Sequence, residues 1–238
     1  MSAATLQTLW IGAQLKPLHT ACLESFLRFG HTIDLYSYEA VNGVPPGIQL
    51  KNAESILPAK KIFAYQKGPG KGSFSAFSNL FRYTLLFERG GVWIDTDVFC
   101  LKRWDLEGPD YLFASETLGS EQARITASCV MKAPPRADVM GYCREQALGC
   151  SLKTLEWGQI GPQLLNRAVT QFKLSHFIRP SWEFCSMGWD EPELLLEQRS
   201  LWTPPKRALG VHLNHEILRR AEKDLSPEII SKLKTWTN

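Results

Sequence analysis

The sequence predicts an α/β fold whose central sheet opens with a parallel strand–helix–strand unit. Residues 6–12 form a short apolar run closed by a glycine, which indicates a first strand. Residues 18–30 carry apolar side chains at helical spacing, and residues 31–38 alternate as a second strand does. The third observation is an apolar helix pattern over residues 73–91, followed directly by the strand of residues 92–95.

The segment between the opening unit and the long helix, residues 39–73, contains "NGVPPG" and "KGPGKGS" and is predicted to be loop. In the helix that follows, Ser73 or Ser75 can cap the first turn. Gly90 stands where a left-handed residue ends many helices. The apolar face of this helix comprises Phe77, Leu80, Phe81 and Leu85.

The second half of the chain continues with alternating elements. Prolines 134 and 135 are expected near the first turn of a helix, and Gly161-Pro162 is expected to open another. The predicted elements are strands at 111–116 and 125–133, helices at 134–150 and 163–172, a mixed region at 174–212 and a final amphipathic helix at 227–237.

Composition excludes several classes of protein. The chain has 238 residues, 44% hydrophobic and 21% charged, which is typical of a folded globular protein. A net charge of +3 without a long basic block argues against nucleic-acid binding. No apolar run reaches the roughly 18 residues of a membrane span. Six cysteines without a CxxC pair indicate free thiols in a reducing compartment, so we expect a cytoplasmic protein. Two alternatives stay open for Lys60, Lys61, Lys67 and Lys71: contact with a phosphorylated ligand, or a solvated loop face.

Two aspartates follow the buried strand "VWI" with one residue between them. In an extended chain, residues i and i+2 project to the same side, so Asp95 and Asp97 are expected to face one spot. Ligand sites of open α/β sheets lie at the carboxyl ends of strands. A divalent cation between the carboxylates would remove their repulsion, and Mg²⁺ or Mn²⁺ suits hard oxygen ligands.

A polar stripe lies on the preceding helix, on the side away from its phenylalanines. Asn79 and Arg82 are three residues apart, with Ser75 and Ser78 one turn away. The planar fork of Arg82 suits phosphate oxygens or the carboxylate of Asp95. The alternative is a surface arginine, paired with Glu88 or left in solvent.

Together these residues resemble a family. "FSNLFRYTLLFERGGVWIDTD" resembles the helix and acidic motif of the DXD-containing sugar transferases, which include bacterial capsular and lipopolysaccharide glycosyltransferases, α-1,4- and α-1,6-glycosyltransferases and, distantly, the clostridial glucosylating toxins. Weaker similarities are "LWIG", "IGPQLLNRAV" and "ALGVHLNHEILR". The matching positions are Ser78, Arg82, Tyr83, Leu86, Gly90, Gly91, Asp95 and Asp97.

The resemblance implies a GT-A type, Rossmann-like nucleotide-diphospho-sugar transferase fold with a mixed central sheet flanked by helices. It implies one domain over residues 1–238. Residues 1–132 would bind the nucleotide sugar through the DXD motif, and residues 133–238 would form the acceptor side with C-terminal helices.

The implied activity is metal-dependent, retaining transfer of a sugar from a UDP- or GDP-sugar, as in polysaccharide biosynthesis. The acceptor would be a hydroxyl of a glycan, a lipid-linked molecule or a protein. The stretch 218–237 could touch a membrane or a partner, or pack as a surface helix.

The resemblance also implies roles for individual residues. Asp97 would bind Mn²⁺ or Mg²⁺ directly, and Asp95 would bind it directly or through water. His212 is the candidate third ligand, with a core histidine as the alternative and Asn214 or His215 as substitutes. The catalytic set is Asp95, Asp97 and Arg82. The substrate-binding set, with Trp10 stacked on the base, is Trp10, Ile11, Ser75, Ser78, Asn79, Arg82, Trp93 and Asp95.

Two departures from the family pattern leave further interpretations open. Trp93 replaces a usual tyrosine, and Asn79 replaces a usual aspartate, which suggests as one alternative a catalytically weakened sugar-nucleotide-binding protein. "VWIDTDV" also fits the haloacid-dehalogenase-like phosphatase signature, with Asp95 as nucleophile and Asp97 as acid/base. That class needs a later lysine and an acidic pair, for which Asp190-Glu191 is the candidate. Glu116 would be the first base to test if transfer proved inverting.

Overall fold

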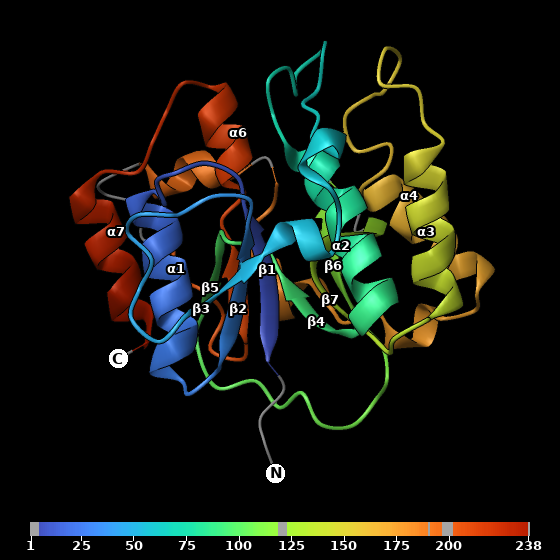
Figure 1. The fold of residues 1–238 in the computed structure, drawn as a ribbon. Helices are drawn as coiled ribbons and strands as arrows, with labels where there is room; N and C mark the ends of the chain where they lie inside the picture. Colours follow the sequence, from blue (N-terminus) through green and yellow to red (C-terminus); the bar gives the residue numbers. More distant parts are fainter. Residues whose placement is uncertain (1–4, 119–122, 190, 197–201, 238) are drawn as a thin grey trace.

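The protein is described by a computed structural model covering residues 5–118, 123–189, 191–196 and 202–237 (Figure 1). A six-stranded sheet in the order β3-β2-β1-β4-β7-β6 forms its centre. Its strands are β1 (Leu6–Trp10), β2 (Ile33–Ser37), β3 (Gln49–Asn52), β4 (Gly91–Ile94), β6 (Leu112–Leu118) and β7 (Ala123–Ala133).

A second, two-stranded sheet pairs β5 (Val98–Cys100) with β8 (Gly210–His212). The helices are α1 (Pro17–Arg28), α2 (Ser75–Arg89), α3 (Asp138–Leu148), α4 (Pro162–Gln171), α5 (Ser181–Phe184), α6 (His215–Arg220) and α7 (Pro227–Leu233).

The central sheet is mixed, as expected. Strands β3, β2, β1 and β4 run parallel, so the predicted strand–helix–strand opening is confirmed. Strand β7 runs antiparallel to β4 and to β6. Because β1 and β4 are parallel neighbours, Trp10 and the acidic motif emerge at the same edge of the sheet.

The two faces of the sheet bury different side chains, since successive residues of a strand point to opposite faces. Trp93 packs with helices α2, α3 and α4, which lie on one side in Figure 1. Val92 and Ile94 pack on the other side with Leu23 and Phe26 of α1. A third cluster joins α1 to β5, β8, α6 and α7. Helix α7 is therefore a packed helix, with Ile230 and Leu233 buried, and this favours the packed alternative for the C-terminal stretch.

Some details of the elements differ from the sequence expectations. The predicted loop 39–73 contains the edge strand β3, which has mostly exposed side chains and no apolar alternation to reveal it. Neither serine is the N-cap residue of α2, because Phe74 occupies that position. Ser73 instead accepts a hydrogen bond from the backbone N–H of Ser75 at 3.1 Å. The two prolines before α3 precede the helix rather than stand in its first turn, since Asp138 is its first residue.

Gly90 ends α2 at the predicted position and with a positive φ of 65°, but its ψ of −163° lies outside the left-handed helical region that the sequence predicts. A Cβ atom there would lie 2.5 Å from the backbone nitrogen of Pro135. We expect Gly90→Ala to lower the free energy of unfolding by about 2–3 kcal/mol, because strain and steric overlap add. Urea denaturation measures this change.

Gly149→Ala is the matched control for this substitution. Gly149 also ends a helix, but its φ is −81°. A Cβ atom there would meet its nearest neighbour at 3.5 Å, which is ordinary contact. We expect the control to be neutral or slightly stabilising. Equal losses at the two glycines would contradict the proposed reason.

Candidate functional site

Asp95 and Asp97 lie in a turn, which corrects the sequence-based reason for their proximity. Strand β4 ends at Ile94, and the N–H of Val98 donates to the carbonyl of Asp95 at 3.1 Å. The N–H of Asp95 donates to the carbonyl of Cys129 on β7 at 2.8 Å. The two carboxylates therefore converge because the chain turns between β4 and β5, not because it stays extended.

His212 joins this acidic pair through the small sheet. In the register of β5 and β8, Val98 lies opposite His212. The Nε2 atom of His212 lies 3.4 Å from Oδ1 of Asp97. One donor atom each of Asp95, Asp97 and His212 lies within 4.8 Å of the other two. Two carboxylates and an imidazole form a donor set that suits Mn²⁺ or Mg²⁺, so these residues fit the implied cation.

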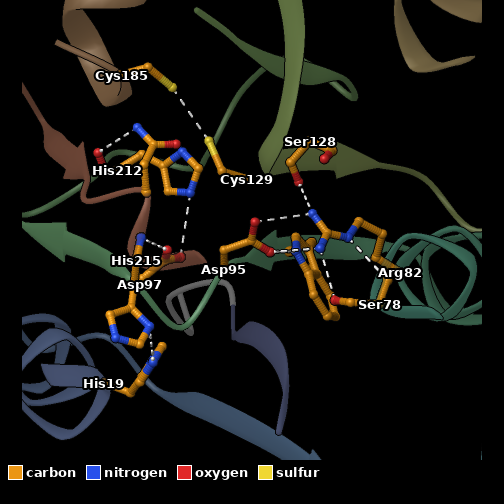
Figure 2. Close-up of polar contacts among 12 residues, drawn as sticks. His19, Ser78, Arg82, Asp95, Asp97, Ser128, Cys129, Cys185, His212 and His215 are labelled. Carbon is orange, nitrogen blue, oxygen red and sulfur yellow. Dashed lines mark hydrogen bonds and ion pairs between the residues drawn. The ribbon is translucent and has the colours of Figure 1, made fainter. Parts of the chain in front are cut away.

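The guanidinium of Arg82 is buried behind the acidic pair (Figure 2). It forms a bidentate ion pair with Asp95, at 2.9 Å from Nη2 to Oδ1 and 3.2 Å from Nη1 to Oδ2. Nη2 also donates to the hydroxyl of Ser78, and Nε to its carbonyl. Nη1 donates to the carbonyl of Ser128 at 2.5 Å. Five contacts match its five N–H groups, so each N–H group of Arg82 already has a partner within the protein.

Trp93 contributes a donor as well as bulk. Its indole N–H donates to Oδ1 of Asp95 at 2.8 Å. The ring also lies under the guanidinium of Arg82, 4.8 Å from its centroid. Arg82 and Trp93 thus contact the carboxylate of Asp95 from two sides, and its remaining side faces Asp97.

The electrostatics of the acidic pair are asymmetric. Burial raises the pKa of Asp95, the Arg82 guanidinium opposes the shift, and the nearby Asp97 adds to it. For Asp97, burial is outweighed by His212, and the pKa is lowered. Burial also disfavours the charged ring of His212, but Cys129 and Asp97 raise its pKa well above the usual value. Asp97 is therefore the stronger anion of the pair.

All of the sequence-predicted site residues line one pocket of about 690 Å³. That volume lies within the roughly 300–1,000 Å³ of small-molecule sites. The pocket opens at the carboxyl ends of β1 and β4, where the sequence places it. The predicted residues that it gathers are Trp10, Ile11, Ser75, Ser78, Asn79, Arg82, Trp93, Asp95, Asp97 and His212. Their roles remain predictions.

The alternative third ligands differ from His212 in how they reach the motif. The backbone N–H of His215 donates to Oδ2 of Asp97 at 3.0 Å, so His215 positions the carboxylate through its main chain. Its ring contacts His19 instead, at 3.3 Å between nitrogens. The amide of Asn214 points to the carbonyl of His212 at 3.5 Å. Of the three candidates, His212 has the side chain aimed at the acidic pair.

The pocket also contains residues that the sequence analysis did not single out. Lys16 and Arg219 are cations in its lining, and Trp157 and Trp189 are aromatic. Lys16 follows β1 in a loop that no local pattern marks as functional. The four lysines considered as phosphate contacts are exposed and do not belong to the lining residues: Lys60, Lys61, Lys67 and Lys71.

His19 is a buried histidine beside the acidic motif that sequence reasoning missed. Burial lowers its pKa from 6.5 to about 4. Between these two pH values, His19 is therefore protonated in the unfolded chain and neutral in the folded chain. The free energy of unfolding consequently falls as the pH falls. We expect the free energy of unfolding to drop by about 2 kcal/mol from this residue between pH 7 and about pH 5.

The matched comparison uses His19→Gln and the exposed His176→Gln, with urea denaturation at both pH values. His19→Gln should lose most of this fall in the free energy of unfolding, and His176→Gln should keep it. Equal pH dependence in the wild type and His19→Gln would show that another group is responsible.

The phosphatase alternative fits the geometry poorly. Both carboxylate oxygens of Asp95 accept hydrogen bonds from Arg82, and Trp93 donates to one of them. Each oxygen of the Asp95 carboxylate is thus already paired with a donor, which disfavours its use as a nucleophile. Of the candidate acidic pair, Asp190 lies outside the described residues.

Comparison with known families supports the resemblance. Residues 34–118 match the model of the glycosyltransferase sugar-binding region containing the DXD motif. The matched segment runs from β2 through α2 and the acidic turn to β6. The resemblance to the DXD-containing sugar transferases is therefore confirmed for this part of the chain. No curated protein matches the chain in sequence.

Solved glycosyltransferase structures have a similar fold. PaToxG glycosyltransferase is 10% identical at a TM-score of 0.51, over 99% of this chain and 85% of that one. The ligand-free and UDP-bound glycosyltransferase domains of the YGT toxin are each 8% identical at 0.51. The alignments cover 98% and 99% of this chain and 88% and 99% of those domains. At such identities the likeness shows the fold alone, and the predicted GT-A type fold is confirmed.

Two further expectations concern membrane-spanning helices and the state of the cysteines. Within the described part of the chain, every helix is too short or too polar to cross a bilayer. All six cysteines lie among the described residues, and each is a free thiol, as expected from their spacing.

Proposed function

We propose that the chain is a metal-dependent, retaining glycosyltransferase that moves a sugar from a nucleotide-diphosphate donor to a hydroxyl acceptor. The observation that carries this proposal is the convergence of Asp95, Asp97 and His212 at the edge of the pocket. The segment that matches the family model, residues 34–118, includes the acidic motif, which supports the proposal. A similarly folded toxin domain binds UDP, which supports a nucleotide donor.

Asp97, Asp95 and His212 would hold the cation, Mn²⁺ or Mg²⁺. When bound, it would act as a Lewis acid that stabilises negative charge on the departing diphosphate. Arg82 is a positioning residue, because its hydrogen bonds fix the carboxylate of Asp95. Trp93 completes this support through its indole N–H.

The nucleoside would lie at the end of β1. Trp10 is partly exposed in the pocket wall, and its ring can stack on a base. Its indole N–H is buried without a hydrogen-bond partner among the described residues, so it can bind a base or ribose oxygen. Ile11 continues this wall.

The donor sugar and ribose would lie against the start of α2. Asn79 lines the pocket, accepts a hydrogen bond from Ser128 at 3.2 Å and packs against Gly161. Ser75 and Ser78 line the same wall. Lys16 is a candidate for binding the diphosphate. Its ammonium group lies 3.8 Å from the carboxylate of Asp224, and both side chains are about half-exposed, so this ion pair is weak.

Retention needs no dedicated carboxylate base, because the departing phosphate can take the proton of the acceptor hydroxyl on the same face of the sugar. Glu116 lines the pocket, and burial raises its pKa. Inverted product, detected by NMR of the anomeric centre, would make Glu116 the first base to examine.

The test is a screen of UDP- and GDP-sugars for Mn²⁺-dependent turnover, with Asp97→Ala beside the wild type. Transfer or donor hydrolysis that needs both the cation and Asp97 supports the proposal. Metal-dependent nucleotide binding without turnover would identify a catalytically weakened binder, the alternative suggested by Asn79. Absence of both binding and turnover would reject the proposed function.

A further inference from the structure

A second cluster of metal-ligating side chains lies directly behind the acidic motif. Cys129 of β7 and Cys185, which follows α5, are buried, and their sulfur atoms are 3.4 Å apart. One donor atom each of Cys129, Cys185 and His212 lies within 4.8 Å of the other two. Figure 2 shows the ring of His212 between Asp97 on one side and Cys129 on the other.

The imidazole of His212 is only partly used by the acidic motif. Its Nε2 atom faces Asp97 at 3.4 Å. Its Nδ1 atom is buried beside the thiol of Cys129, which is a weak hydrogen-bond partner, and it has no other partner among the described residues. Buried polar atoms are normally well satisfied, so a buried nitrogen with only a weak partner suggests a further ligand such as an ion. A cation bound to Nδ1 beside the sulfur atoms would satisfy it.

The spacing of the sulfur atoms suits a tetrahedral ion. Two Zn–S bonds of the usual length at the tetrahedral angle separate the sulfurs by about 3.8 Å. The observed separation of 3.4 Å differs from this by only a few tenths of an ångström. A small rotation of the side chains is enough for this change. A disulfide would require a larger movement, because its two sulfur atoms are only about 2.05 Å apart.

The two ligand sets that share His212 differ in chemical softness. Carboxylates select hard cations such as Mg²⁺ and Mn²⁺, whereas thiolates select softer ones such as Zn²⁺. Asp95 and Asp97 stand on one side of the ring, and the two sulfurs stand on the other. One imidazole therefore separates a hard donor set from a soft one.

We propose that Cys129, Cys185 and the Nδ1 atom of His212 form a binding site for a soft divalent cation of the Zn²⁺ type, distinct from the Asp95–Asp97 pair. Three protein ligands leave a fourth position for solvent. Cys129 and His212 both line the pocket, so an ion can reach the site from there. Metal bound on Nδ1 fixes the ring with Nε2 directed at Asp97. This site does not depend on the transfer reaction.

The experiment titrates the reduced, metal-free full chain with Co²⁺, a spectroscopic probe for Zn²⁺ sites. We expect one equivalent to bind with a thiolate-to-Co²⁺ charge-transfer band, which excess Zn²⁺ removes and excess Mg²⁺ does not. Cys129→Ser and Cys185→Ser should each weaken Co²⁺ binding by at least about tenfold. Cys143→Ser, at a buried cysteine of α3, is the matched control and should keep the band. Lack of a thiolate band in the wild type, or its survival in both serine variants, would overturn the proposal.

A second measurement covers the case in which a serine variant does not fold. Alkylation of the wild-type thiols with and without Zn²⁺, mapped by mass spectrometry, needs no substitution. We expect Zn²⁺ to slow the alkylation of Cys129 and Cys185 at least about tenfold and to leave Cys150 unchanged, since Cys150 is the most accessible of the six thiols. Equal rates at Cys129 and Cys185 with and without the cation would also overturn the proposal, as would a disulfide between them in the freshly purified chain.

Discussion

Asp97→Asn is expected to lower the rate of metal-dependent sugar transfer by at least about 100-fold. Asparagine keeps the shape of the side chain and can still accept the hydrogen bond that His215 donates to Asp97 at 3.0 Å. It removes the negative charge that makes Asp97 the stronger anion of the acidic pair. The measurements are kcat at saturating donor and Mn²⁺, and Mn²⁺ affinity by calorimetry.

Asp110→Asn is the control, because Asp110 is exposed and is not among the pocket residues. It should change neither quantity. Asparagine keeps the size of the side chain and the hydrogen bond from the backbone of His215, so Asp97→Asn should remain folded. Turnover and Mn²⁺ affinity unchanged in Asp97→Asn would remove the role assigned to this carboxylate.

Arg82→Met is expected to lower the free energy of unfolding by about 3–5 kcal/mol, the range for breaking a buried ion pair from one side. The guanidinium is buried, and its removal leaves Asp95 without its main counter-charge. It also leaves the carbonyl of Ser128 without its donor. Urea denaturation in the absence of metal and nucleotide measures the loss.

Arg136→Met is the matched control. Arg136 pairs with Glu88 at 3.1 Å, but its side chain is 66% exposed. An exposed pair of this kind contributes about 0–1 kcal/mol. Adding Asp95→Asn to Arg82→Met should recover part of the loss, because the buried charge disappears with its partner. Similar losses in Arg82→Met and Arg136→Met would contradict the structural role of Arg82.

The elements that the sequence predicted best are those whose signals are local. Helix α2, its glycine end and strand β4 follow one another within the segment 75–94, and each is specified by its own neighbours. The edge strand β3 was missed because its side chains are mostly exposed and carry no apolar alternation. Local patterns also predicted that the carboxylates meet, although a turn rather than an extended strand brings them together.

The rest of the site depends on contacts that no local pattern encodes. His212 reaches Asp97 through the pairing of two three-residue strands, β5 and β8, and strands so short have no readable periodicity. It was nominated from the family resemblance, not from its own surroundings. Lys16 and His19 enter the pocket because α1 starts beside the end of β1. Such side chains can be found only once the fold is known.

The most direct test of the proposed function is a crystal structure of the chain soaked with Mn²⁺ and UDP or GDP. The proposal predicts an anomalous manganese peak between the carboxylates of Asp95 and Asp97, with diphosphate oxygens completing the coordination and the base near Trp10. Manganese absent from the acidic turn, with the diphosphate bound elsewhere in the pocket or not at all, would contradict it.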